Sequence, residues 1–210
     1  MNAPDDVRPR RLIVLRHAKS AWPEDVPDHE RPLAGRGRRD APAAGRWLRQ
    51  EHCAPDLVIC STARRTRETW DGVAAELGAS ASAVTGGTAD APRAARASGP
   101  AAVRPGAPAA PEVVFEPRVY QAGAEALLQV VRAVPERWRT VLLIGHQPGV
   151  QDLVLSLAGE GDDEALARAG EKFPTSAVAV LALPGGWAGL APGCARLTAF
   201  AVPRGIKGGA

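Results

Sequence analysis

The chain has 210 residues, of which 45% are hydrophobic, 23% charged and only 4% aromatic. These proportions fit one globular domain and exclude a collagen-like, disulfide-framework or wholly disordered chain. No apolar run approaches the roughly 20 residues that a membrane span needs, and no signal-peptide core follows the charged N-terminus. We therefore expect a soluble, cytoplasmic protein with no membrane partner.

The formal net charge of +3 arises from 26 Lys and Arg residues that are scattered among 23 acidic residues. There is no basic block and no interleaving of basic with aromatic residues, so no nucleic-acid partner is expected. The three cysteines, Cys53, Cys60 and Cys194, are odd in number and widely spaced. That spacing excludes a disulfide framework and a CxxC metal or redox site.

One segment differs in composition from the rest of the chain. From Ala79 to Pro111 the sequence is built mainly from Ala, Gly, Pro, Ser and Thr. Such a segment cannot bury enough apolar surface to offset the entropy of ordering its backbone. We interpret residues 1–210 as a single domain with a flexible insertion at about residues 79–111.

The remaining sequence alternates between continuous apolar runs, typical of buried strands, and segments with helical periodicity. In chain order, the expected elements are strand 11–15, helix 38–50, strand 57–60, helix 65–77, strand 113–115, helix 124–134, strand 141–144, helix 150–157 and strands 176–183 and 196–202. The Pro/Gly-rich stretch between the last two strands suits a hairpin-like connection. This alternation predicts the α/β class: a three-layer α/β/α sandwich with a mostly parallel central sheet.

Three polar segments each follow directly after a predicted buried strand. They are RHAKS with Arg16 and His17, STARRTRET at Ser61–Thr69, and GHQPG at Gly145–Gly149. Alone, each has an ordinary structural interpretation as a solvated strand end, an exposed helix face or a turn. Because ligands of open α/β sheets bind at the carboxyl ends of strands, the three segments together can place two histidines and at least two arginines around one substrate.

Histidine combined with arginine favours phosphoryl chemistry over a metal site, since no carboxylate or cysteine cluster accompanies the histidines. Arginine binds phosphate oxygens with a planar, permanently charged fork. A neutral imidazole can take the phosphoryl group as a phosphohistidine and so divide the hydrolysis into two steps. We predict that His17 is this nucleophile, kept neutral by neighbouring guanidinium groups, and that a protonated His146 completes the site. Neither a metal nor an organic cofactor is expected.

The combination of motifs resembles the histidine phosphatase superfamily. RHAKS, the S-x-x-x-R-T-x-x-T pattern that starts at Ser61, and GHQPG look like three signatures of that superfamily in the same order. With DHERPLAGRG and KFPTSAVAVL added, the chain is similar to SixA-type phosphohistidine phosphatases. The resemblance spans roughly residues 11–78 and 112–204 and implies the histidine phosphatase fold. It also implies four catalytic residues: Arg16, His17, Arg65 and His146.

The sequence departs from the mutase-like branch of the superfamily. Ala18 replaces a glycine of that branch and Pro23 replaces an asparagine that touches phosphate, so a phosphoglycerate mutase is not expected. The acid/base glutamate of that branch has no clear counterpart, and Gln121 lies near the place where many relatives carry an acidic residue. The resemblance therefore leaves the proton donor unassigned.

The loop after the first strand supplies further candidates. Asp28 and Glu30 are the candidate proton donors, and the alternative is a structural loop in which Asp28 pairs with Arg31. Substrate binding is assigned to the four catalytic residues together with Ser20 and Asp28.

We therefore predict a phosphatase that acts on phosphohistidine or another accessible phosphoryl group through a phospho-His17 intermediate. Its partner is expected to be a phosphorylated protein or a small phosphorylated substrate. One alternative is a small-molecule phosphomonoesterase on the same scaffold, acting on a sugar phosphate or nucleotide. The other is a non-catalytic module that binds phosphoprotein, which the retention of all four catalytic residues disfavours. The motifs leave the oligomeric state open.

Overall fold

The computed structural model describes residues 9–78, 83–84 and 110–206. In chain order its elements are β1 (Arg10–Arg16), η2 (Asp28–Glu30), α1 (Gly35–Gln50), β2 (Leu57–Ser61), α2 (Arg64–Leu77), β3 (Ala83–Val84), β4 (Glu112–Glu116), η3 (Pro117–Val119), α3 (Ala124–Arg132), β5 (Thr140–Gly145), α4 (Gly149–Leu157), β6 (Ala158–Gly161), α5 (Asp163–Glu171), β7 (Val178–Leu183), η4 (Trp187–Gly189) and β8 (Ala195–Ala201). Most of the predicted insertion at 79–111 lies outside the described residues, and only β3 and the segment from residue 110 onward belong to them.

An eight-stranded sheet forms the middle of the molecule, with the strand order β3-β4-β2-β5-β1-β7-β8-β6. β1 pairs in parallel with β5 and antiparallel with β7, and β7 pairs antiparallel with β8. The other neighbouring strands of the described sheet are parallel, so β7 alone among them runs in the opposite direction. The predicted mostly parallel sheet is confirmed.

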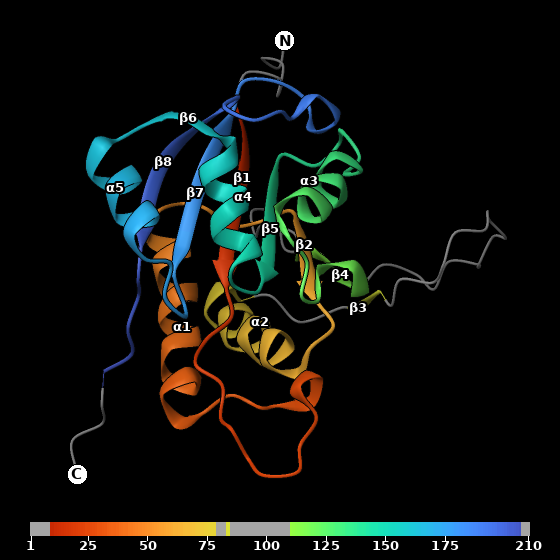
Figure 1. Cartoon of the computed structure of the whole chain (residues 1–210), viewed down its shortest axis with the longest axis vertical. Helices are drawn as coiled ribbons and strands as arrows, with labels where there is room; N and C mark the ends of the chain where they lie inside the picture. Colours follow the sequence, from red (N-terminus) through yellow and green to blue (C-terminus); the bar gives the residue numbers. More distant parts are fainter. Residues whose placement is uncertain (1–8, 79–82, 85–109, 207–210) are drawn as a thin grey trace, which may run out of the picture.

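Helices cover both faces of this sheet, as Figure 1 shows. α1 and α2 pack against each other on one face, and α3, α4 and α5 lie on the other. β1 contributes to the hydrophobic core on both faces of the sheet. Leu12 and Val14 pack on the face covered by α3, α4 and α5, and Ile13 and Leu15 pack on the face covered by α1 and α2. All four side chains are fully buried, and each such burial contributes about 1.5–3 kcal/mol. β1 is therefore packed on both of its faces as far as Leu15, directly before Arg16 and His17.

Every predicted element is present, and its ends differ from the predicted ones by at most three residues. The strand expected from residue 176 begins at Val178, because Ser176 has a φ of +63°, which lies in the left-handed region. β6 and α5 were not predicted. α5 begins after Asp162, whose side chain accepts a hydrogen bond of 2.9 Å from the backbone N–H of Ala165. No helix among the described residues is both long and apolar enough to cross a membrane.

The close approach of α4 to the loop before α3 gives a testable prediction. A Cβ atom added at Gly149 would collide with the backbone carbonyl oxygen of Ala122, whereas one added at Gly170 in α5 would meet no atom within 4 Å. We predict that Gly149→Ala lowers the free energy of unfolding by about 1–3 kcal/mol, as overpacking does. Gly170→Ala is the matched control and should cause no loss, because alanine is the better helix former. Urea unfolding with equal midpoints for the two variants would contradict this packing.

Candidate active site

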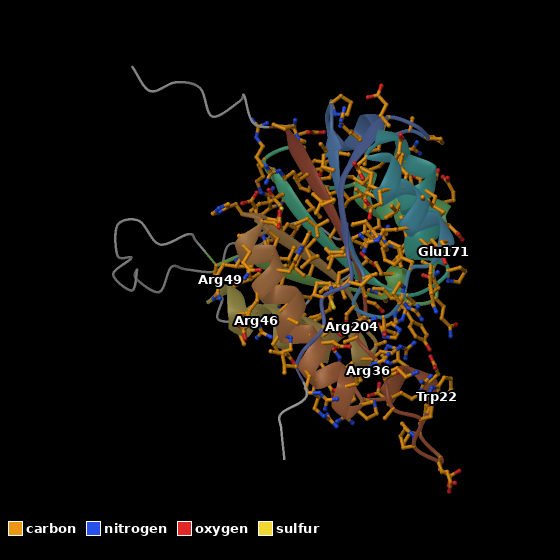
Figure 2. The ribbon with its side chains drawn as sticks, turned by 90° about the vertical axis from the view of Figure 1, so that its left-hand side faces the viewer. Trp22, Arg36, Arg46, Arg49, Glu171 and Arg204 are labelled. Atoms are coloured by element: carbon orange, nitrogen blue, oxygen red, sulfur yellow. The ribbon has the colours of Figure 1, made fainter. Side chains whose placement is uncertain are left out.

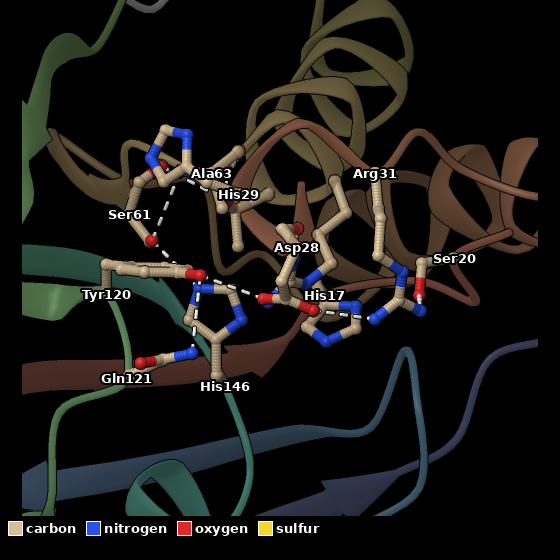
Figure 3. A network of polar contacts seen from close by, with 12 residues as sticks. His17, Ser20, Asp28, His29, Arg31, Ser61, Ala63, Tyr120, Gln121 and His146 are labelled. Atoms are coloured by element: carbon tan, nitrogen blue, oxygen red, sulfur yellow. Dashed lines mark hydrogen bonds and ion pairs between the residues drawn. The ribbon is translucent and has the colours of Figure 1, made fainter. Parts of the chain in front are cut away.

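The structure brings the three polar segments together at one edge of the sheet. β2, β5 and β1 are neighbours, so Ser61 at the end of β2, His146 after β5 and His17 after β1 lie close together. The imidazole centroids of His17 and His146 are 5.2 Å apart, and both residues are buried. Arg65 reaches the same place from the first turn of α2 (Figure 3 shows the surrounding polar contacts). We call Arg16, His17, Arg65 and His146 the cage.

The ring of His17 is held in one tautomer. Its Nδ1 atom lies 2.8 Å from the backbone carbonyl oxygen of Ala18. A carbonyl oxygen can only accept, so Nδ1 carries the hydrogen and Nε2 of the neutral ring carries the available lone pair. Burial is the main cause that lowers the pKa of His17 to about 3, and the nearby charges of Arg65 and Arg16 lower it further. The ring is therefore neutral at pH 7, although burial rather than arginine is the first reason.

The backbone around His17 is fastened from several sides. The N–H of His17 donates to the carbonyl oxygen of Gly145 over 3.1 Å, and the N–H of Ser176 lies 3.3 Å from the carbonyl oxygen of His17. The N–H of Ala18 donates to Thr69 Oγ1 over 3.0 Å, and that hydroxyl donates to the carbonyl oxygen of Arg65 over 2.6 Å. Ala18, whose carbonyl oxygen fixes the His17 tautomer, is thus hydrogen-bonded to α2, the helix that carries Arg65.

Arg16 is anchored at the opposite side of the β1 end. Its Nη1 donates to the backbone carbonyl oxygen of Phe173 over 2.8 Å, and its Nε is buried with no hydrogen-bond partner among the described residues. Burial lowers the pKa of Arg16, but a guanidinium group stays protonated in proteins. Unsatisfied buried donors are uncommon, and they mark places where a ligand or water completes the hydrogen bonding.

Arg65 is oriented by Asp28. Its Nη1 donates to the backbone carbonyl oxygen of Asp28 over 2.6 Å, and its Nη2 donates to Asp28 Oδ2 over 3.0 Å. The same Oδ2 accepts a hydrogen bond of 2.8 Å from the hydroxyl of Tyr120, and Oδ1 accepts one of 2.7 Å from Arg31 Nη1. Figure 3 shows the Asp28 carboxylate between Arg31 and Tyr120, the residue after η3.

These contacts bear on the roles expected for the loop. Burial raises the pKa of Asp28, but the hydrogen bonds of Tyr120, Arg31 and Arg65 outweigh it and bring the pKa to about 2. An ionised carboxylate has no proton to donate, so these contacts disfavour Asp28 as the proton donor; its role as a substrate ligand stays a prediction. The hydrogen bond from His29 lowers the pKa of Glu30, so Glu30 is ionised as well. The alternative, a pairing of Asp28 with Arg31, is what the structure shows.

His146 is buried next to Ser61, at the end of β2. Its Nε2 lies 2.8 Å from Ser61 Oγ, and its Nδ1 is buried without a partner among the described residues. Burial, followed by the charge of Arg65, lowers the pKa of His146 to about 3. Burial and the adjacent cation therefore favour the neutral ring, and the protonated His146 expected around a phosphoryl group stays a prediction.

Ser20 is connected to the cage through Arg31 and Asp28. Its hydroxyl accepts a hydrogen bond of 2.9 Å from Arg31 Nη2 and is buried. Ser20 therefore helps to hold Arg31, and its role as a substrate ligand stays a prediction.

Two aromatic residues of the site were not predicted. Tyr120 is the one tyrosine of the sequence, and its ring stands edge-on to His146 with centroids 5.5 Å apart. His29 packs edge-on against Tyr120 with centroids 4.8 Å apart, and its Nε2 lies 2.9 Å from Thr62 Oγ1. The available signal was the position of Tyr120 just after a strand at the same edge of the sheet. Burial and Asp28 raise the pKa of Tyr120, so its hydroxyl stays a hydrogen-bond donor at neutral pH.

Comparison with known proteins agrees with this geometry. The family described as the histidine phosphatase superfamily (branch 1) matches residues 12–86. An uncharacterized protein of Mycobacterium tuberculosis is 42% identical over 192 residues, which cover 90% of this chain and 100% of the relative.

Solved structures extend the match to the whole fold. The SixA protein of Nakamurella multipartitia superposes with a TM-score of 0.68 at 30% identity, covering 95% of this chain and 99% of the other. The structure of the protein histidine phosphatase SixA complexed with tungstate has the same fold, with a TM-score of 0.61, 19% identity and coverage of 92% and 97%. The chain belongs to the histidine phosphatase superfamily, branch 1.

Proposed function

We propose that this protein hydrolyses a phosphoryl group carried on a histidine of a protein, through a phosphorylated His17 intermediate. The observation that carries the proposal is the His17 ring itself, which is neutral, fixed by Ala18 and placed beside two arginines and a second histidine. Membership of the superfamily supports a phosphatase. The neighbour from Nakamurella multipartitia, which bears the name of a phosphohistidine phosphatase, supports the choice of substrate.

In the first step, the lone pair of His17 Nε2 forms a bond to phosphorus while the bond from phosphorus to the substrate nitrogen breaks. The electron pair of that bond goes to the leaving nitrogen, which takes up a proton. His17 becomes a positively charged phosphoimidazole, and the hydrogen bond from Nδ1 to Ala18 favours this charged form. In the second step water attacks phosphorus and gives a proton back to the group that protonated the leaving nitrogen; the N–P bond breaks, and its electron pair returns to Nε2 as phosphate leaves.

Arg16 and Arg65 bind the phosphoryl oxygens, on which the transition state carries its negative charge. Their orientation is set before substrate arrives, because Phe173 holds one guanidinium and Asp28 holds the other. Preorganised charge of this kind needs no rearrangement at the moment of reaction. Asp28 is accordingly a positioning residue that acts through Arg65.

The leaving-group proton is assigned to His146. Asp28 and Glu30 are ionised, whereas the His146 ring is neutral and lies within the cage. A phosphoryl dianion bound beside this ring raises its pKa, since an opposite charge favours the charged form. His146 then takes up a proton when substrate binds and can pass it to the leaving nitrogen.

The first test concerns the nucleophile. His17→Ala should abolish turnover, because it removes the atom that bonds to phosphorus. Rapid quenching of the wild-type protein with radiolabelled phosphohistidine should trap acid-labile phosphate on the chain. His52→Asn is the matched control, since His52 is an exposed histidine outside the cage, and it should keep both turnover and label. Full activity of His17→Ala, or label that persists in it, would overturn the proposed intermediate.

The second test separates two adjacent arginines. Arg65 is buried and bound to Asp28, whereas Arg64 is exposed and pairs with Glu68 over 2.7 Å. Arg65→Ala should reduce kcat/KM on the order of 100-fold, as the loss of a preorganised charge donor does. Arg64→Ala should change it by less than about twofold, because an exposed ion pair is worth little. Steady-state kinetics with equal losses for both variants would be incompatible with the assignment.

A further inference from the structure

The loop between β1 and η2 carries an exposed tryptophan that the proposed chemistry does not use. The side chain of Trp22 is 75% exposed, and the other large exposed hydrophobic residues among those described are aliphatic. Figure 2 shows Trp22 at the outer surface of this loop. A single exposed apolar side chain is ordinary in itself. Trp22 differs from an ordinary exposed residue because its indole stacks on the guanidinium group of Arg31.

Trp22 is stacked on a guanidinium group that is itself fixed. The Cζ atom of Arg31 lies 3.1 Å from the centroid of the indole, and Arg31 is buried. Arg31 Nε donates to the carbonyl oxygen of Ala21 over 3.0 Å, and its two terminal nitrogens donate to Ser20 and Asp28. The indole therefore stacks on a guanidinium plane that is fixed by three hydrogen bonds. A side chain that is ordered in advance loses little entropy when a partner covers it.

The same anchors connect Trp22 to the cage. Asp28 binds Arg31 through Oδ1 and Arg65 through Oδ2, over 2.7 and 3.0 Å. The contacts thus run from the indole to Arg31, then to Asp28, and then to the arginine that binds the phosphoryl group. Two side chains lie between the indole and Arg65 along this path, so a partner that covered the indole would do so away from the phosphorus.

This placement favours a protein over a small phosphorylated molecule. A folded protein surrounds its phosphorylated side chain with a broad surface, which can reach the cage and cover the indole at the same time. A nucleoside monophosphate has a single base close to its phosphate, whereas Arg31 and Asp28 lie between the indole and Arg65. Tryptophan side chains that are covered on binding are among the residues that contribute most to protein interfaces.

We infer that Trp22 is a docking residue for the surface of a phosphorylated protein, held in register with the cage through Arg31 and Asp28. The inference rests on the proposed function and adds a recognition site to it. Trp22 contributes to the binding of protein substrates, whereas the cage binds and transfers the phosphoryl group of any substrate.

The experiment compares substrates in one variant. The probes are a small helical protein phosphorylated on a surface histidine with phosphoramidate, free phosphohistidine, and adenosine monophosphate. In Trp22→Ala, the ratio of kcat/KM for the phosphorylated protein to kcat/KM for free phosphohistidine should fall about tenfold, the size of effect typical of a truncated interface tryptophan. Trp22→Phe should recover part of that ratio, since it keeps an aromatic ring.

Leu155→Ala is the matched control, because Leu155 is another exposed hydrophobic residue, on α4, and its variant should keep the wild-type ratio. An unchanged ratio in Trp22→Ala, an equal loss on all probes, or a selective loss on adenosine monophosphate would each overturn the inference. The first leaves the proposed function intact, the second shows a structural role, and the third shows base stacking. Wild-type protein that hydrolyses the other probes but not the phosphorylated protein would instead contradict the proposed function, and the inference with it.

Discussion

The hydrogen bond from His17 Nδ1 to the carbonyl oxygen of Ala18 is the interaction on which the proposed chemistry depends. It is a contact between adjacent residues, so it forms only while the backbone after β1 keeps its shape. That shape is maintained by the two-sided burial of β1 and by the bond from Ala18 to Thr69 on α2. Burial of the apolar side chains of β1 thus stabilises the backbone that orients the Nε2 lone pair of His17. Burial of the same ring keeps that lone pair free of a proton.

Asp28 is the second constraint, and it places a negative charge inside a site suited to anions. The carboxylate offsets part of the positive charge of Arg65 and Arg31 while no ligand is bound, and it fixes where both guanidinium groups lie. Through Arg31 it also orients the exposed Trp22. In the proposed function, catalysis and recognition are therefore coupled at one side chain, which accounts for an acidic residue beside the cage.

The sequence predicted the parts of this arrangement that leave a local pattern. β1 and β5 are continuous apolar runs, and the cage residues follow such runs within short motifs, so both could be placed. Asp28 and Tyr120 are 92 residues apart and Asp28 and Arg65 are 37 apart, so only the folded chain reveals their contacts. The neutral state of His146 depends on burial, which the motif does not encode. α5 was missed although Asp162, three residues before the N–H that it caps, was a readable start signal.

The most direct test of the central claim is the ¹⁵N NMR spectrum of the His17 ring, recorded from pH 8 to pH 5 and assigned by comparison with His17→Ala. We expect a neutral ring with hydrogen on Nδ1 and a bare Nε2 throughout this range, because burial lowers the pKa of His17 to about 3. Hydrogen on Nε2 of the neutral ring, or protonation with a midpoint near the ordinary histidine value of about 6.5, would contradict it.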